Sequence, residues 1–297
     1  MKIGYPCINR SLSCNGNRTF RLQSYSEERL QHTIQNNLDC LSRILQYNLD
    51  HGVLFFRITS DLVPFASHPI CTFPWQRTFQ HQFNEIGQFI RKNNMRISMH
   101  PDQFIVLNTP REEVFQRSIA ELAYHAAVLD LLDLDTTAKI QLHVGGVYGD
   151  KSQSLQRFID RFTSLDHSIT RRLVIENDEK SYHIKDCLQI SGKTGIPILF
   201  DHFHHSLLHN HELLVQVLYS CQETWMKKDG IPMVDYSSQK PDKPPGAHAE
   251  HLDSSSFTHF LLQSQPYDFD LMLEIKDKEH SAIQALELLK TDPRLIH

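Results

Sequence analysis

The chain has 297 residues, a formal net charge of −5 with histidines neutral, and 40% apolar residues. This length allows one large α/β domain or two smaller ones, and the acidic balance excludes a protein that binds nucleic acid merely by being basic. Nucleic acid is still compatible with the sequence, because divalent cations would add positive charge at the spot where a phosphate would lie. The 19 histidines are many for this length, and histidine is the commonest metal ligand in proteins.

Six cysteines are scattered along the chain without a C-x-x-C pair. This usage predicts reduced thiols and a cytosolic compartment. No apolar stretch approaches the length of a membrane span, and the N-terminus runs directly into a strand pattern. We therefore expect a soluble, unsecreted, cytoplasmic protein with no membrane association.

Strand and helix patterns alternate from end to end. The apolar runs predict strands at residues 2–5, 53–58, 97–100, 140–143, 173–176, 196–201, 231–236 and 271–275. The helical patterns predict helices at residues 26–47, 78–93, 110–132, 151–164, 183–191, 208–227, 253–263 and 280–290. The segment 61–77 carries three prolines, so we expect it to be irregular and functional.

Eight βα units in about 300 residues are typical of a (β/α)₈ TIM barrel. Several strands are almost continuously apolar, as strands buried on both faces should be. The competing fold is a doubly wound open sheet, which binds ligands at a single switch point. No linker, repeat or low-complexity tract divides the chain, so the sequence predicts one TIM-barrel domain over residues 1–297.

Six of the predicted strands end on a side chain that can bind metal. These strand-end residues are His100, His143, Glu176, Asp201, Asp235 and Glu274. Two further candidates lie just beyond strands, namely His204 and His248. Because all strands of a barrel end at the same rim, we expect these side chains to converge in one space.

Such a set of nitrogen and oxygen ligands without cysteine suits Mn²⁺ or Zn²⁺. A carboxylate shared between two sites can bridge metals about 4 Å apart, and we predict this role for Glu176. Any one of these residues could instead be a satisfied polar group or a rim ion pair. The whole set argues against that interpretation, because several carboxylates in one cavity repel each other unless a cation lies among them.

The absence of a nucleotide-binding loop and of a cysteine nucleophile leaves metal-assisted hydrolysis or sugar isomerisation as the chemistry. Loops on the same rim carry arginines, amides and aromatic residues that favour DNA phosphates and exposed bases. Gln103 and Phe104, just after the strand that ends at His100, could wedge between bases. The alternative for this pair is that Phe104 belongs to the core and Gln103 caps a turn.

Nine short motifs in chain order closely resemble the UV damage endonucleases. They are Gly4-Tyr5-Pro6-Cys7-Ile8-Asn9, Ser67-His68-Pro69, Met99-His100-Pro101-Asp102-Gln103, Leu142-His143-Val144-Gly145-Gly146, Glu176-Asn177-Asp178, Asp201-His202-Phe203-His204-His205, Tyr236-Ser237-Ser238, Gly246-Ala247-His248-Ala249 and Leu273-Glu274-Ile275-Lys276-Asp277-Lys278-Glu279. Together they cover nearly the whole chain. The resemblance is specific because all of them occur together.

This resemblance implies a TIM barrel related to endonuclease IV and an ATP-independent enzyme. Such an enzyme nicks DNA on the 5′ side of UV photoproducts and of some other lesions, using Mn²⁺. The implied ligands are His100, His143 and Glu176 for one ion; Glu176, Asp201, Asp235 and Glu274 for a second; and His204 and His248 for a third.

The resemblance also assigns residues that act on the DNA. Tyr5 and Asn9 resemble positions near the cleaved strand, and His68 resembles a rim residue close to the scissile phosphate. Together with Glu176, Tyr5 and His68 are the expected catalytic residues. Gln103 and Phe104 match the pair that probes the lesion.

One departure from the relatives concerns the seventh strand. Many relatives read Lys-x-His where this chain has Met233-Val234-Asp235. Asp235 offers an anionic oxygen in place of a neutral imidazole, which should favour Mn²⁺ over Zn²⁺. Met233 can supply neither charge nor ligand.

We therefore expect a monomeric endonuclease for damaged double-stranded DNA, with two to three Mn²⁺ ions, no nucleotide cofactor, and association with the nucleoid when it acts. Zn²⁺ and Mg²⁺ are alternative ions. An abasic-site endonuclease and a metal-dependent sugar isomerase or epimerase are the alternative enzymes. A DNA-damage binding protein with structural metals is the alternative from another class.

Overall fold

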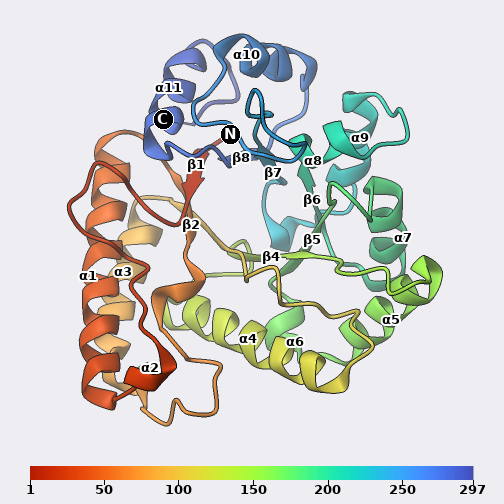
Figure 1. Ribbon diagram of the computed structural model, residues 1–297. Coiled ribbons are helices and arrows are strands. Elements are labelled where there is room, and N and C mark those ends of the chain that lie inside the picture. Colours follow the sequence, from red (N-terminus) through yellow and green to blue (C-terminus); the bar gives the residue numbers. More distant parts are fainter. Residues whose placement is uncertain (297) are drawn as a thin grey trace.

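Eight strands separated by helices close into one parallel barrel in the computed structural model, which describes residues 1–296 (Figure 1). The strands are β1 (Ile3–Pro6), β2 (Phe55–Ile58), β3 (Arg96–Met99), β4 (Lys139–His143), β5 (Leu173–Glu176), β6 (Ile198–Asp201), β7 (Met233–Tyr236) and β8 (Asp270–Leu273). Closure comes from β1 and β8, where Ile3 pairs with Leu271 and Gly4 with Met272. The prediction of a TIM barrel is confirmed, and the open sheet is excluded.

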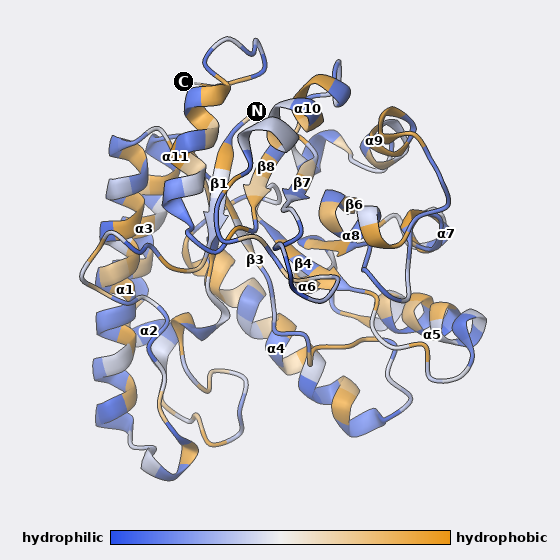
Figure 2. Cartoon of the chain, turned by 45° about the horizontal axis from the view of Figure 1, so that its top comes forward, coloured by the Kyte–Doolittle hydropathy of each residue, from blue (hydrophilic) through white to orange (hydrophobic). Residues whose placement is uncertain are grey.

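The helices pack around the outside of the barrel (Figure 1). They are α1 (Glu27–Asp50), α2 (Trp75–Thr78), α3 (Gln80–Lys92), α4 (Glu112–Leu131), α5 (Lys151–Ser164), α6 (His167–Thr170), α7 (Ile184–Thr194), α8 (His202–Leu207), α9 (Leu214–Gln222), α10 (Ser254–Gln263) and α11 (Glu279–Leu288). Leu30, Ile34, Leu38, Leu41 and Leu45 give α1 a buried stripe at helical spacing. In Figure 2 the helices accordingly carry both hydrophilic and hydrophobic residues, as expected for helices that pack on the core with one face and meet solvent with the other.

The chain after β6 differs from the prediction. A single helix over residues 208–227 was expected, but the structure has α8 directly after the strand and a shorter α9. The cause is a cap: the side chain of Asp201 accepts a hydrogen bond of 2.6 Å from the backbone N–H of His204, which starts a helix at once. This early helix turns His204 back over the barrel.

Side chains that point into the barrel form three layers along its axis, because alternate residues of a strand face inward. The lowest layer is charged and consists of Arg96, Lys139 and Asp270. The middle layer is apolar and consists of Phe55, Val174, Leu199, Met233 and Met272. The top layer is polar and consists of Arg57, Gln141, Glu176, Asp201, Asp235 and Glu274. The apolar layer therefore separates two sets of buried charges.

A disulfide joins the loop after β1 to α1. Cys14 and Cys40 form a disulfide with a Cα–Cα distance of 5.7 Å, so the expectation of six reduced thiols is wrong for these two. The first loop folds across α1 and brings Cys14 to a residue 26 positions away, which no local spacing reveals.

In the part of the chain that the structure describes, no helix is long and apolar enough to cross a membrane.

Candidate metal centre

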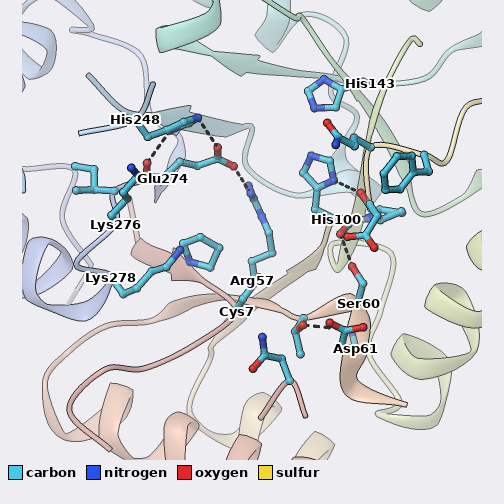
Figure 3. A pocket seen from close by; sticks show the side chains of 18 residues that line it. Cys7, Arg57, Ser60, Asp61, His100, His143, His248, Glu274, Lys276 and Lys278 are labelled. Atoms are coloured by element: carbon cyan, nitrogen blue, oxygen red, sulfur yellow. Dashed lines mark hydrogen bonds and ion pairs between the residues drawn. The ribbon is translucent and has the colours of Figure 1, made fainter. Parts of the chain in front are cut away.

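A pocket of about 710 Å³ opens at the carboxyl ends of the strands. Its lining includes His100, His143, His248 and Glu274 from the predicted metal set, together with Arg57 from β2 (Figure 3). The strand-end rule that predicted a shared rim thus brings together residues that lie up to 174 positions apart.

Glu176 lies where three imidazoles converge. Its Oε2 atom is 3.6 Å from His100 Nε2 and 3.8 Å from His143 Nε2, and its Oε1 atom is 2.9 Å from His204 Nδ1. Glu176 itself is 1% exposed, so water does not screen these contacts. Both oxygens of one buried carboxylate therefore face candidate ligands, which is the geometry that a bridging role requires.

A second group of candidate ligands consists of carboxylates alone. Asp201, Asp235 and Glu274 each place one oxygen within a common distance of 4.8 Å. Asp201 and Asp235 are fully buried. This group offers only oxygen atoms, which suits a harder ion than the histidine group does.

Arg57 and Gln141 hold the carboxylates of this layer. Arg57 Nη2 donates to Asp235 Oδ2 at 2.6 Å and to Gln141 Oε1 at 2.7 Å, and Arg57 Nη1 pairs with Glu274. The amide nitrogen of Gln141 donates to Asp235 Oδ2 at 2.6 Å and also to Glu176. Arg57 and Gln141 therefore orient three of the four acids, with one oxygen of each acid bound to a protein donor.

The pKa values of the four buried acids show that the positive charge of the protein is distributed unevenly among them. Burial alone would raise the pKa of Glu176, but the three imidazoles around it hold that pKa well below its usual range. Burial also opposes ionisation of Glu274, yet Arg57 lowers its pKa to about 2. By contrast, burial raises the pKa of Asp201 well above its usual range, and it raises the pKa of Asp235 to about 7 against the charge of Arg57. Two of the four acids thus lack enough positive charge from the protein.

Buried polar atoms without a protein partner point to the same conclusion. Asp201 Oδ2, Asp235 Oδ1 and His143 Nδ1 are buried, and none of them has a hydrogen-bond partner within residues 1–296. A buried acceptor left unsatisfied costs free energy, so native structures usually provide a partner for it. Carboxylate oxygens are ligand atoms that divalent ions prefer, so the unpaired oxygens of Asp201 and Asp235 at this rim fit such ions.

The structure groups two of the predicted ligands differently from the expectation. His204 belongs with Glu176 and Asp201, all three within 4.8 Å. His248 Nε2 is 3.9 Å from Glu274 Oε2, and its ring centroid is 6.4 Å from that of His204. Glu179, which the sequence did not single out, lies 3.8 Å from His204 Nε2. The pair His204 and His248 is therefore flanked by Glu176, Asp201, Glu274 and Glu179.

Three residues assigned by resemblance lie away from this pocket. Tyr5 is fully buried and donates from its hydroxyl to Asn48 at 2.5 Å. Asn9 is 5% exposed; its amide donates to the Tyr5 hydroxyl at 2.9 Å, and its carbonyl accepts from the backbone of the first loop. His68 is exposed on the second loop, where its ring lies near Phe65. Through these hydrogen bonds, Tyr5 and Asn9 hold the start of the loop that follows β1.

Gln103 and Phe104 both line the pocket. Phe104 is 75% exposed, so the alternative that it belongs to the core is wrong. An exposed aromatic side chain beside a polar pocket is free to stack on a base. Trp75, the first residue of α2, behaves differently: it is 3% exposed and packs against Phe83 and Tyr124, so it cannot stack on a base.

Arg57 and Gln141 were not predicted from the sequence, although a signal exists. Each is a polar residue at an inward-facing position of a strand, two residues beyond the apolar or charged layer below it. Period-two counting along each strand would have shown that both side chains point into the barrel. The residues to which Arg57 and Gln141 bind could not be predicted in this way.

A parallel barrel whose rim gathers imidazoles and carboxylates around a pocket defines the class of barrel enzymes with metal-binding sites at the carboxyl ends of the strands. Comparison with known proteins narrows this class. The family described as "UV-endonuclease UvdE" matches residues 1–295. A UV DNA damage endonuclease of Clostridium perfringens is 39% identical over 292 residues, which span 98% of this chain and 71% of that protein.

Solved structures agree with this assignment. The crystal structure of SacUVDE superposes with a TM-score of 0.95 at 46% identity, covering 99% of this chain and 100% of the other. Endonuclease IV from Thermus thermophilus shares the fold, with a TM-score of 0.58 at 15% identity over 84% of this chain and 93% of that one. The chain belongs to the UvdE family of UV endonucleases, and it is a DNA-repair endonuclease.

Proposed function

We propose that this endonuclease nicks the DNA backbone 5′ to UV photoproducts, namely pyrimidine dimers and 6-4 photoproducts, by metal-assisted phosphodiester hydrolysis without ATP. The observation that carries the proposal is Glu176, a buried carboxylate with three imidazoles around its two oxygens, two of which, those of His100 and His143, line the open pocket. Membership of the UvdE family supports the same substrate class.

The proposed ions are Mn²⁺, two to three per chain, with Zn²⁺ or Mg²⁺ as alternatives. The residues proposed to hold them are His100, His143, Glu176, Asp201, His204, Asp235, His248 and Glu274. Bound divalent ions would supply Lewis acidity, because they lower the pKa of water and neutralise charge that develops on a phosphate. The carboxylate group Asp201, Asp235 and Glu274 supports a preference for Mn²⁺ over Zn²⁺.

The protein's own residues contribute orientation and charge. Glu176, which accepts a hydrogen bond from Gln141 and lies beside His100, would orient the attacking oxygen. Arg57 keeps a fixed positive charge beside Glu274, within the pocket that would receive the phosphate. His68 is proposed to lie near the scissile phosphate. Tyr5, the remaining candidate catalytic residue, would act through Asn9, which it holds at 2.9 Å.

The proposed substrate is damaged double-stranded DNA. Phe104 and Gln103 stand at the mouth of the pocket, where an exposed ring could replace a displaced base in the stack. A lesion weakens local stacking and pairing, so inserting this pair costs less there than in intact duplex. We propose that the protein works as a monomer in the cytoplasm, in association with the nucleoid.

The test is nicking of supercoiled plasmid that has been UV-irradiated, made abasic, or left untreated, each with Mn²⁺ and with a chelator. We expect nicking of the irradiated plasmid, dependence on the metal, and little nicking of the untreated plasmid. A strand mapped on a defined thymine-dimer duplex should end on the 5′ side of the dimer. Equal nicking of irradiated and untreated plasmid would defeat lesion specificity, and preference for the abasic plasmid would favour the abasic-site alternative.

A further inference from the structure

We propose that Lys278 is a phosphate-binding residue that holds the DNA backbone at the metal pocket, at a phosphate next to the cleaved bond. The proposal rests on the proposed endonuclease function and adds a residue to its DNA-binding surface. It starts from the cations of the pocket. Besides histidines, three cationic residues line it: Arg57, Lys276 and Lys278.

Two of these cations already have acidic partners. Arg57 is bound to Asp235 and Glu274, and Lys276 Nζ lies 3.3 Å from Glu250. Within residues 1–296, no carboxylate lies within ion-pair distance of Lys278, and no hydrogen bond neutralises its ammonium group. An ammonium group that lines a pocket without an acidic partner is available to a phosphate oxygen.

The backbone of Lys278 supports a functional role. Its φ is 60° and its ψ is −116°, a conformation that side-chain-bearing residues rarely adopt. Cys7, which lines the same pocket, also has a positive φ of 72°. Strained non-glycine residues persist only where the surroundings enforce them, and they cluster at functional sites.

The surroundings that enforce this conformation can be identified. The next residue, Glu279, is fully buried and accepts hydrogen bonds from the backbone N–H groups of Arg10 and Ser11, both at 2.7–2.9 Å, and from the Ser11 hydroxyl. This anchor ties the first loop to the start of α11. Lys278 is thereby fixed on the β8 side of the pocket, facing Cys7 and Arg57, while Asp61 and His100 lie across from it (Figure 3).

The arrangement assigns different tasks to the two sides of the pocket. Gln103 and Phe104 line the pocket on the β3 side, where a lesion would be probed. Lys278 contributes a single charge on the β8 side, where it can hold a phosphate regardless of base sequence. A phosphate contact of this kind adds affinity equally to damaged and intact duplex.

The experiment measures equilibrium binding by fluorescence anisotropy over a range of salt concentrations. Two duplexes of the same sequence are used, one with a single thymine dimer and one without. All proteins carry Glu176→Gln so that the duplex stays intact. We expect Lys278→Gln to weaken binding to both duplexes by about five- to tenfold near 0.1 M salt, and to reduce the slope of log K against log[salt] by about one unit. Lys278→Arg should keep the slope.

Two further variants keep the outcome interpretable. Lys276→Gln removes a neighbouring charge that is already paired with Glu250, so we expect the slope to stay unchanged. Lys278→Gly removes the charge and tolerates a φ of 60°, so it should fold at least as stably as the wild type yet lose the same slope. A wild-type slope in both Lys278→Gln and Lys278→Gly would overturn the proposal, as would an equal loss in Lys276→Gln.

Neutral methylphosphonates identify the phosphate itself. Each backbone position around the dimer is replaced in turn, and wild-type Lys278 is compared with Lys278→Gln. At the contacted position, the neutral linkage should weaken binding by the wild-type residue and cause no further loss in the variant. Additive losses at every position would contradict direct contact. Failure of the proposed function has a different signature, namely equal affinity of the protein with Lys278 for the dimer-containing and the intact duplex, whatever the salt slopes of the Lys278 variants.

Discussion

The two ends of the barrel both contain buried charges, but they balance them differently. At the amino ends of the strands, Arg96 pairs with Asp270 at 3.1 Å and Lys139 with Asp229 at 2.5 Å. Each acid there has its own cation. At the carboxyl ends, four acids share one guanidinium, that of Arg57, and the imidazoles.

The same strands thus carry buried charges that serve the fold at one end of the barrel and buried charges of the candidate functional site at the other end. A buried pair that neutralises itself needs nothing from outside, so it can serve only the fold. Of the four carboxylates at the other end, Asp201 and Asp235 each keep a buried oxygen without a partner, and this shortage of positive charge makes the upper layer a candidate metal centre. The apolar layer of Phe55, Val174, Leu199, Met233 and Met272 keeps the two sets apart. Substitutions at the two ends should therefore have opposite consequences.

The largest expected effect comes from Glu176→Gln in the upper layer. The amide keeps the shape of the side chain but removes the charge that faces three imidazoles. We expect cleavage of a UV-damaged duplex to fall by more than about 10³-fold, because the site loses the group proposed to orient the reacting oxygen. Binding of the damaged duplex should persist. Single-turnover cleavage and anisotropy measure the two properties, and retained cleavage would remove the bridging role.

The matched control is Asp270→Asn in the lower layer. It leaves Arg96 buried without its carboxylate, which should cost about 3–5 kcal/mol of unfolding free energy. Cleavage per folded molecule should stay at the wild-type level. Urea titration measures the loss. A defect in cleavage by the folded fraction would show that the two ends of the barrel are coupled.

Removing metal should destabilise the protein through the upper layer. Burial opposes the charge of His204, but Asp201 and Glu176 raise its pKa to about 11 in the metal-free protein. Metal binding must therefore displace a proton and also relieve carboxylate repulsion. At 100 times the dissociation constant, one ion adds about 2.7 kcal/mol. We expect a lower Tm in chelator, restored by Mn²⁺, and a release of protons on binding measured by calorimetry in buffers of different ionisation enthalpy. Glu176→Gln should weaken this response; an equal response would place the ions elsewhere.

His125 in α4 offers a buried histidine without carboxylates of the metal centre around it. Burial lowers its pKa to about 4 from an ordinary value of 6.5. The folded state therefore prefers the neutral ring, and the stability present above pH 6.5 is lost as the pH falls towards 4. The full effect is about 3 kcal/mol. In chelator, His125→Gln should flatten the dependence of unfolding free energy on pH in that window, whereas exposed His81→Gln should leave it unchanged. If His125→Gln left the pH dependence unaltered, protonation of this ring would not be a cause of the loss of stability in acid.

The smallest expected effect concerns lesion discrimination at the mouth of the pocket. Replacing Gln103 and Phe104 together by alanine should reduce the preference for damaged over intact duplex by about tenfold, or roughly 1.4 kcal/mol. The physical reason is loss of the exposed ring that would fill the gap in the base stack. Competition binding with the two duplexes measures the ratio. The salt slope should not change, because neither side chain carries charge; an unaltered preference would rule out the wedge.

The sequence by itself determined the barrel and the rim. Alternating strand and helix patterns predicted eight βα units, and a strand's carboxyl end is marked locally by where its apolar run stops. For this reason the sequence alone places six side chains at one rim, namely His100, His143, Glu176, Asp201, Asp235 and Glu274. Barrel closure then brings them together, whatever their separation in the chain.

Only the tertiary structure decided which of these residues face one another. The register between strands sets that Arg57 meets Asp235 and that Gln141 meets Glu176, and register is a property of strand pairs that no single strand encodes. The Asp201 cap turned His204 towards Glu176, and the first loop brought Cys14 to Cys40. Burial of Tyr5 against Asn48 likewise depends on packing between distant segments. Local patterns specify where a side chain leaves the backbone, whereas its partners follow from long-range packing.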